Sequence, residues 1–298
     1  MAEIAILTPA FSPWHPLTEG FRDGLEELGH VGGRNVRFEV RAAQGDATRL
    51  PALARELTGR RPSLLYCVGT AAAEECARTA PDVPLVFVEV PDPVRVGLVQ
   101  GLANPGGNAT GLANLRSELA AKRLELFKEV VPSLRRVLVT YDPREPEELA
   151  ALGVIRRAAA ALGLALLERA ITSRLDVEPG LAELERGGHD GILIVQFGAH
   201  LGIAGRSLEV ATSNGLPTMY PSPFWTTHGA LASYGADQYR QGRQAARLAH
   251  RILAGTPPRA LPVELPDRVE FTLNLKVARR LGLSVPRAAL LRADRVID

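Results

Sequence analysis

Cysteine, tryptophan and lysine are scarce in this sequence, and the shortages narrow the classes of protein it can encode. The two cysteines, Cys67 and Cys76, are too few for a disulfide framework. A single disulfide between them is possible, but two buried free thiols fit better, because free cysteine packs as a small hydrophobe. All basic residues except Lys122, Lys128 and Lys276 are arginine, which indicates a GC-rich genome rather than a selected arginine patch.

Charge of one sign is not in excess. The net charge is +2, and acidic and basic residues are interleaved rather than gathered in runs. A basic face of the kind that binds nucleic acid is therefore not indicated, and we expect no nucleic-acid partner.

Long apolar runs are also absent. No run approaches the roughly 20 residues that a membrane-spanning helix needs. The chain enters a strand pattern at Ile4, without the basic and apolar regions of an export signal. Either the protein is cytoplasmic or an export signal has been removed from it.

Motifs of common enzyme classes are missing as well. The chain has no GxSxG, HExxH, CxxC pair or GxGxxG. Of the scattered histidines, only His15 and His200 fall in loops that follow predicted strands. A two-lobed racemase would need a cysteine in each half, and the second half has none. We therefore predict no enzyme, no catalytic residue, no cofactor and no metal.

What the sequence does contain is a pattern that occurs twice. Strand, helix, strand, helix and strand patterns follow one another through residues 4–69 and again through residues 136–198, at an offset of about 130 residues. Each half then continues into a further strand, PLVFVEVPDP in the first and PTMYPSPF in the second. Such a repeat predicts an α/β protein with two Rossmann-like parallel-sheet lobes.

The segments outside the repeats predict how the lobes are connected. The second half is followed by more elements than one lobe needs, among them a helix from Gln238 and a proline-flanked strand at 261–267. The simplest packing gives a three-segment hinge with crossings near 110–115, 234–238 and 264–270, where Gly235 would supply backbone freedom. The predicted N-terminal lobe is 1–112 plus 239–264, and the C-terminal lobe is 115–233 plus 270–298.

Two such sheets predict a ligand cleft between them, at the carboxyl ends of the strands. Aromatic residues are concentrated in the loops that follow these strands. Seven of the 15 aromatic residues lie there, namely Phe11, Trp14, Tyr141, Phe197, Tyr220, Phe224 and Trp225. In a chain that is only 5% aromatic, this concentration indicates a flat or apolar ligand.

Several segments resemble a known family along nearly the whole chain. The most specific are the pattern DPV…GL…NPGGN.TG at residues 92–111 and LNLKVARRLGL at 273–283. With FRDGLEELGHVGG at 21–33 and YGADQYRQGRQAARLAHRILAG at 234–255, they resemble ABC-transporter substrate-binding proteins, the family that includes tryptophan and tyrosine binders.

The resemblance implies a type I periplasmic-binding-protein fold that traps a small-molecule solute by lobe closure. It also implies delivery to an ABC permease in the membrane, a monomer, and a periplasmic or extracellular membrane-anchored location. Segment 198–210, GAHLGIAGRSLEV, is of the kind that sets ligand identity, and it matches no known specificity.

Two polar positions are candidates for a charged ligand. Gly69 and Thr70 open a predicted helix, where backbone N–H groups favour a carboxylate; alternatively, Thr70 only caps its helix. Asp237 precedes the helix from Gln238 and either pairs with a ligand ammonium or caps that helix.

The remaining candidates come from the same set of loops and crossings. Asp92 fits a turn residue better than a ligand contact, and Asp142 has the same interpretation. Asn114 and Gln196 either fix polar ligand groups or bond to neighbouring loop backbone. The predicted contacts that remain are Phe11, Ser12, Trp14, Tyr141, Tyr220 and Tyr234.

The sequence thus predicts a solute receptor for an aromatic amino acid or related aromatic carboxylate. One alternative is a branched aliphatic amino acid or another small carboxylate. The other is the effector-sensing core of a transcription regulator, which would need a DNA-binding segment before the first strand.

Overall fold

The computed structural model describes residues 1–298 except 115, 145, 173–175, 182–183, 185–189 and 196–200. The chain forms two compact units, each made of two segments. Unit 1 comprises Met1–Asn114 and Gln238–Asp267, and unit 2 comprises Leu115–Asp237 and Arg268–Asp298. The chain therefore passes from one unit to the other after Asn114, Asp237 and Asp267.

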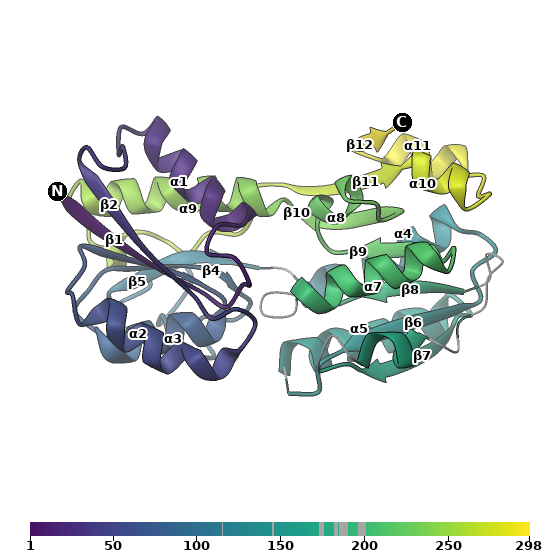
Figure 1. The fold of residues 1–298 in the computed structure, drawn as a ribbon, viewed down its shortest axis with the longest axis horizontal. Helices are drawn as coiled ribbons and strands as arrows, with labels where there is room; N and C mark the ends of the chain where they lie inside the picture. The colour runs from purple at the N-terminus through teal and green to yellow at the C-terminus, as the bar shows by residue number, and fades with distance from the viewer. Residues whose placement is uncertain (115, 145, 173–175, 182–183, 185–189, 196–200) are drawn as a thin grey trace. The chain divides into compact units, whose positions relative to one another are not determined.

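Unit 1 is built on a parallel sheet of the order β2-β1-β3-β4-β5 within the described residues (Figure 1). Its strands are β1 (Ala2–Thr8), β2 (Val36–Ala42), β3 (Leu64–Val68), β4 (Leu85–Val90) and β5 (Ala109–Ala113). Its helices are α1 (Pro16–Glu27), α2 (Leu50–Thr58), α3 (Thr70–Thr79) and α9 (Gln238–Leu253), with 3-10 turns at Ala47–Arg49 and Pro258–Ala260.

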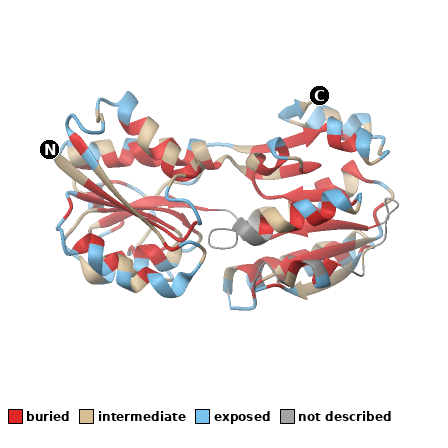
Figure 2. Ribbon diagram, viewed as in Figure 1, coloured by how far each residue is buried: buried red, intermediate tan, exposed pale blue. Residues whose placement is uncertain are grey.

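Both faces of this sheet are buried, because apolar side chains alternate between two cores. Ile4 and Ile6 of β1 pack with α1 and α9, whereas Ala5 and Leu7 pack with α2 and α3. Strands β1, β3, β4 and β5 are accordingly buried almost throughout, whereas the edge strand β2 is mostly half-buried (Figure 2). Continuous apolar strands are what a parallel sheet covered on both faces requires.

Helices α1 and α9 approach each other closely through glycines. A Cβ on Gly20 would lie 2.0 Å from the carbonyl oxygen of Tyr239, and one on Gly242 would lie 2.2 Å from that of Leu17. Only glycine permits this contact between the two backbones. It joins the segment after Asp237 to the first helix of the chain.

Unit 2 repeats the arrangement on a sheet of the order β12-β11-β10-β9-β8-β6-β7 among the described residues. Among the strands that the structure describes in this sheet, only the β10–β11 pair is antiparallel. The strands are β6 (Arg136–Tyr141), β7 (Ala165–Ala170), β8 (Asp190–Ile194), β9 (Thr218–Tyr220), β10 (Ala232–Ala236), β11 (Val269–Asn274) and β12 (Arg295–Ile297). The helices are α4 (Arg116–Val130), α5 (Pro146–Ala161), α6 (Val177–Leu181), α7 (Leu201–Ser213), α8 (Pro223–Thr227), α10 (Leu275–Arg280) and α11 (Arg287–Arg292).

The unit 2 sheet also has a core on each face. Val137 and Val139 of β6 pack with α4 and α5, and Leu138 between them packs with α6, α7 and α8. The β-α-β-α-β repeat predicted from the sequence is confirmed, since β7-β6-β8-β9 has the same order as β2-β1-β3-β4.

Three local expectations differ from the structure. Ala109–Ala113, expected as part of a crossing loop, is the edge strand β5. Residues 261–267 form no strand but an isolated bridge between Leu112 and Glu264. Gly235 lies in β10, where a Cβ would be 1.8 Å from the Pro221 carbonyl oxygen, so close packing rather than backbone freedom requires glycine there.

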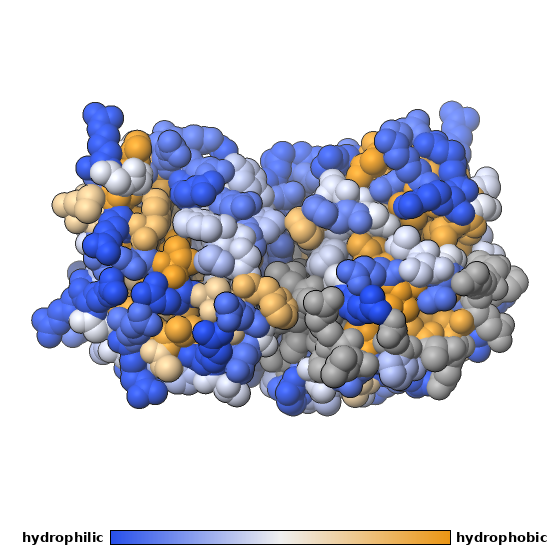
Figure 3. All heavy atoms as spheres, in the orientation of Figure 1, coloured by the Kyte–Doolittle hydropathy of each residue, from blue (hydrophilic) through white to orange (hydrophobic). Residues whose placement is uncertain are grey.

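The cysteines, the lengths of the helices and the surface complete the description of the fold. Cys67 and Cys76 are both buried free thiols. Among the described residues, no helix is long and apolar enough to cross a membrane. On the face drawn in Figure 3, polar residues dominate and apolar side chains form separate patches.

Candidate functional site

The sheet of unit 1 has a topological switch point between β1 and β3, where the strand order reverses. Ligands of open parallel sheets bind outside the carboxyl ends of the strands at such a point. The loops that follow β1 and β3 contain Phe11, Ser12, Trp14, Gly69 and Thr70, all predicted from the sequence as ligand contacts.

A buried hydrogen-bond network fixes the loop after β1. His15 Nε2 lies 2.9 Å from Thr8 Oγ1, which also accepts the Ala10 N–H at 3.2 Å. The His15 N–H donates to Thr18 Oγ1 at 2.9 Å at the start of α1. Burial lowers the pKa of His15 to about 4, with Glu89 acting in the opposite direction. The imidazole is therefore neutral at neutral pH and holds the loop in place.

The three predicted residues of this loop have different surroundings. Phe11 is 48% exposed and lies over Gly45, where a Cβ would be 2.6 Å from Phe11 Cζ. Ser12 Oγ accepts the Trp14 N–H at 3.3 Å. Trp14 packs edge-on against Phe38, with Arg22 over its ring at 4.9 Å. Phe11 is thus the more accessible aromatic ring, and Trp14 is engaged within unit 1.

The start of α3 lies at the same edge of the sheet. Gly69 is the N-cap residue, with φ +83, and its N–H donates to the Val88 carbonyl oxygen at 2.9 Å. Thr70 is the first helical residue, so Gly69 rather than Thr70 occupies the N-cap position of α3. The first amides of a helix have no acceptor within the helix, which keeps this position suitable for an anion.

Glu89 is a residue at this edge that the sequence interpretation missed. It is only 6% exposed and has φ +59, a conformation that non-glycine residues rarely adopt. The β4–β5 register shifts between Phe87 and Val90 at the same place. Its two carboxylate oxygens accept hydrogen bonds from Asn114 Nδ2 at 3.3 Å and Gln241 Nε2 at 3.1 Å.

Strain and a buried carboxylate together are typical of functional sites. One signal of Glu89 was present in the sequence, because it interrupts the apolar run PLVFVEV. Its partner Asn114 was predicted as a site residue, and the structure places it buried beside Glu89 at the end of β5.

Asp92 behaves as a turn residue. Its Oδ1 accepts the Arg95 N–H at 2.9 Å, and its exposed carboxylate lies 3.8 Å from Arg95 Nε. Because this geometry accounts for the aspartate, we do not retain it as a ligand contact.

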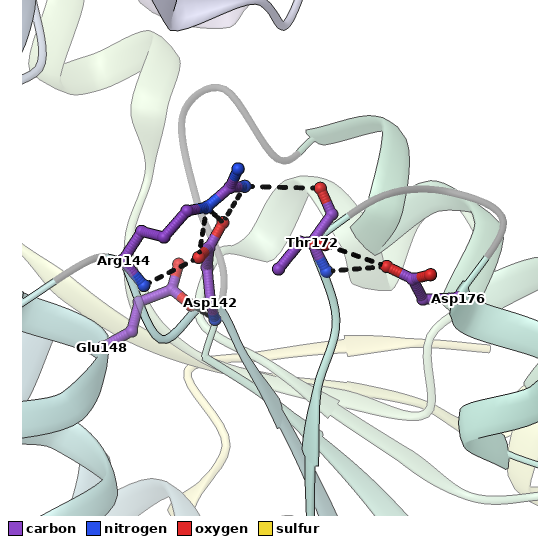
Figure 4. Close-up of polar contacts among 5 residues, drawn as sticks. All are labelled: Asp142, Arg144, Glu148, Thr172 and Asp176. Atoms are coloured by element: carbon purple, nitrogen blue, oxygen red, sulfur yellow. Dashed lines mark hydrogen bonds and ion pairs between the residues drawn. The ribbon is translucent and has the colours of Figure 1, made fainter.

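In unit 2 the corresponding switch point lies between β6 and β8. Asp142 follows β6 there and is fully buried. Its Oδ1 accepts the Arg144 N–H at 2.9 Å, which is the bond of a turn residue, as the sequence predicted. Its carboxylate pairs with the Arg144 guanidinium at 2.5 Å, and its N–H donates to Glu148 Oε2 at 2.6 Å (Figure 4). Asp142 is therefore held on both sides, by the ion pair with Arg144 and by the hydrogen bond to Glu148.

The predicted tyrosines of unit 2 lie mainly against its core. Tyr220 is fully buried, donates its hydroxyl to the Ala204 carbonyl oxygen at 2.8 Å and stacks near Trp225. We therefore do not retain Tyr220 as a ligand contact. Tyr141 and Tyr234 also pack against the core but remain partly exposed.

Two predicted residues remain. Asp237 is partly buried and directly precedes Gln238, the first residue of α9, which is the N-cap position of a helix. Gln196 lies outside the described residues.

With one parallel and one mostly parallel sheet and polar groups at their carboxyl ends, the chain is a two-unit binding protein of the type I periplasmic fold. It belongs to the family of ABC transporter substrate binding proteins, whose model matches residues 10–297. The chain is similar to the tyrosine-binding protein of Clostridioides difficile, with 27% identity over 281 residues, covering 93% of this chain and 80% of that protein.

Solved structures agree with this assignment. A conserved domain protein from Vibrio cholerae has 28% identity and a TM-score of 0.85, with 99% of both chains covered. A Streptococcus pneumonia ABC domain in complex with L-Trp has 23% identity and a TM-score of 0.84, again with 99% of both chains covered.

Proposed function

We propose that this protein is the extracytoplasmic solute receptor of an ABC importer and binds an aromatic amino acid or a related aromatic carboxylate. It works as a monomer in the periplasm or anchored outside the cell membrane, and it passes its ligand to the permease. It carries out no catalysis. Binding brings its two units together around the ligand by rotation at the three chain crossings.

The observation that carries this proposal is the similarity to a tyrosine-binding protein along 93% of the chain. The carboxyl edge of unit 1 supports it. The start of α3 at Gly69 and Thr70 suits a ligand carboxylate, and the half-exposed Phe11 offers a ring to an aromatic side chain. Ser12 and Asn114 complete the proposed contacts from this unit.

From unit 2 we propose contacts by Tyr141, Tyr234 and Gln196. Asp237 is the proposed partner of the ligand ammonium, because it stands at one of the crossings and is partly exposed. A charge-assisted hydrogen bond gains strength where ligand binding excludes water.

A thermal-shift screen of the purified protein tests the ligand class. L-tyrosine, L-tryptophan and L-phenylalanine are expected to raise the melting temperature, since a ligand that binds only the folded state stabilises it. L-leucine tests the aliphatic alternative. Stabilisation by sugars or nucleotides alone would contradict the proposal.

Two variants test the proposed charge contacts. Thr70→Val removes a hydroxyl donor, and Asp237→Asn removes the partner of the ammonium. Each is expected to weaken the binding of the best amino-acid ligand by about tenfold in calorimetry, which corresponds to about 1.4 kcal/mol. Unchanged affinity in both variants would exclude this mode of recognising a zwitterion and leave the fold assignment intact.

A further inference from the structure

Helix α9 buries three glutamines in its first half. Gln238, Gln241 and Gln244 are 6%, 4% and 3% exposed, and their spacing places each next to the following one along the helix. The buried positions from Ala245 onward are alanine, leucine and isoleucine, which pack in the same core as α1. A buried amide costs free energy unless it is hydrogen-bonded, so the partners of these side chains show what they do.

Gln244 holds the segment that leads to the third crossing. Its Nε2 donates to Glu264 Oε2 at 2.7 Å and to the Leu265 carbonyl oxygen at 2.9 Å, and its Oε1 accepts the Asp267 N–H at 3.1 Å. Asp267 is the last residue of unit 1 before the chain passes to unit 2 for the last time. Both ends of the amide therefore fix this segment to α9.

Gln241 reaches the first crossing through Glu89. Gln241 Nε2 and Asn114 Nδ2 each donate to one carboxylate oxygen of Glu89, at 3.1 and 3.3 Å. Asn114 is the last residue of unit 1 before the first crossing, and α9 begins directly after the second. The buried carboxylate thus joins the chain on either side of its first excursion into unit 2.

A backbone contact closes this network. The Glu264 N–H donates to the Gly111 carbonyl oxygen, and the Glu264 carbonyl oxygen accepts the Ala113 N–H, both at 2.9 Å. The segment held by Gln244 is therefore bonded to β5, the strand that leads to the first crossing. Through its glutamines, α9 holds the unit 1 ends of all three crossings.

Stability alone does not account for this arrangement. Within the part of the chain that the structure describes, Gln241 Oε1 is buried without a hydrogen-bond partner. Glu89, which accepts from the same side chain, has a left-handed backbone with φ +59. Both features cost free energy of folding, and such costs are concentrated where a geometry serves function.

We propose that Gln241 and Gln244 are positioning residues for closure on the ligand. They hold the unit 1 ends of the crossings as one rigid group, so that closure changes the conformation of only the few residues between the units. Freedom that these ends lack before binding is freedom that the ligand does not have to remove. This inference rests on the proposed function, because it gives the glutamines a role in its closure step without contact to the ligand.

Calorimetry with L-tyrosine and L-tryptophan tests this role in three variants. Gln244→Met and Gln241→Met keep the length of the side chain and remove its hydrogen-bonding amide. Thr58→Val is the matched control, since this buried hydroxyl donates to the Ala54 carbonyl oxygen at 2.9 Å in α2 of the same unit, outside the network of α9. The melting temperature of each variant measures the loss of stability separately from the loss of affinity.

Both glutamine variants should bind these amino acids about fivefold more weakly than the wild type, with a less favourable entropy, because the ligand must then order the loosened crossings. Thr58→Val should lose stability and keep wild-type affinity. Wild-type affinity in either folded glutamine variant would reduce that glutamine to a stabilising role. It would overturn this inference and leave the proposed function standing.

Amide hydrogen exchange of the unliganded wild type is a second measurement, which needs neither a variant nor a ligand. The Asp267 N–H, which donates to Gln244 Oε1, should be protected from exchange, and so should the Ala113 N–H. Fast exchange at both groups would overturn the inference even if the glutamine variants do not fold. Protection of both in a protein that binds no aromatic amino acid would contradict the proposed function and leave the rigid group in place.

Discussion

At the scale of single residues, the carboxyl edge of unit 1 concentrates groups that cost folding energy. Glu89 is a buried carboxylate in a left-handed conformation, and His15 is a buried imidazole with its pKa lowered to about 4. Such costs persist where the surrounding structure holds the residue, and they are common at binding sites. Because the pKa of His15 is lowered by burial, the stability of the protein should depend on pH.

Stability should fall as the pH is lowered through the range set by His15. The folded pKa of about 4 lies below the ordinary value of 6.5, so the unfolded chain takes up this proton first. Above about pH 6.5 the titration of His15 does not change the free energy of unfolding. As the pH approaches 4, it lowers that free energy by about 3 kcal/mol. Urea unfolding of wild type and His15→Gln across this range measures the difference.

His15→Gln keeps a polar group near Thr8 but has no imidazole to protonate. Between pH 6.5 and pH 4 it should therefore lose about 3 kcal/mol less stability than the wild type. His228→Gln is the control, because that exposed side chain directly follows α8 in unit 2, outside unit 1. Parallel pH profiles of the wild type and His15→Gln would show that His15 is not buried as a neutral group.

At the scale of secondary-structure elements, the α1–α9 pair joins two distant parts of the chain. Gly20 and Gly242 bring the helix backbones together, and Phe21 stacks on Tyr66 of β3 at a centroid distance of 3.8 Å. Packing this dense leaves no room for a methyl group next to a backbone carbonyl. The contact is what holds α9 in unit 1.

Gly242→Ala is expected to destabilise the protein by about 3 kcal/mol, because its Cβ would lie 2.2 Å from the Leu17 carbonyl oxygen. Gly153→Ala in α5 provides the opposite case. No atom lies within 4 Å of a Cβ at that position, so alanine should stabilise the helix by about 0.5–1 kcal/mol. Chemical denaturation measures both, and equal effects would contradict this account of the α1–α9 contact.

At the scale of the whole molecule, two units with separate cores are connected by three passages of the chain. Folds of this type respond to ligands by hinge motion, because contacts made to both units favour the closed state. A receptor that works in this way becomes more compact when it is saturated.

Small-angle X-ray scattering tests that behaviour. Saturating L-tyrosine is expected to reduce the radius of gyration, whereas L-arabinose, as a compound outside the proposed class, should leave it unchanged. A radius that stays constant while calorimetry shows full binding would contradict closure on the ligand.

Local patterns in the sequence predicted much of this architecture. The period of the apolar residues gave the two β-α-β-α-β repeats, and Gly29, with φ +90, directly follows the Leu28 C-cap of α1. Asp46 caps the first 3-10 turn through its side chain, which accepts the Thr48 N–H two residues on. Each of these features depends on residues a few positions apart.

The site was less predictable, because its members are brought together by contacts distant in sequence. Asn114 and Gln241 meet on Glu89 from β5 and α9, and no local pattern joins these three residues. Tyr220 was predicted in the site from its position after a strand, yet its ring packs in the core. The side on which a residue after a strand packs depends on the helices that cover the sheet.

By itself, the sequence determined the order of most elements, the duplication and the α/β fold class, because apolar periodicity and glycines act between near neighbours. The family followed from the resemblance of whole segments, such as LNLKVARRLGL at 273–283, to a known family. Only the tertiary structure decided that Ala109–Ala113 is a strand, that Glu89 is buried in a left-handed conformation, and that Asp142 holds Arg144 at the edge of its sheet. Burial and charge pairing depend on which segments meet in space, and spacing along the chain does not specify those partners.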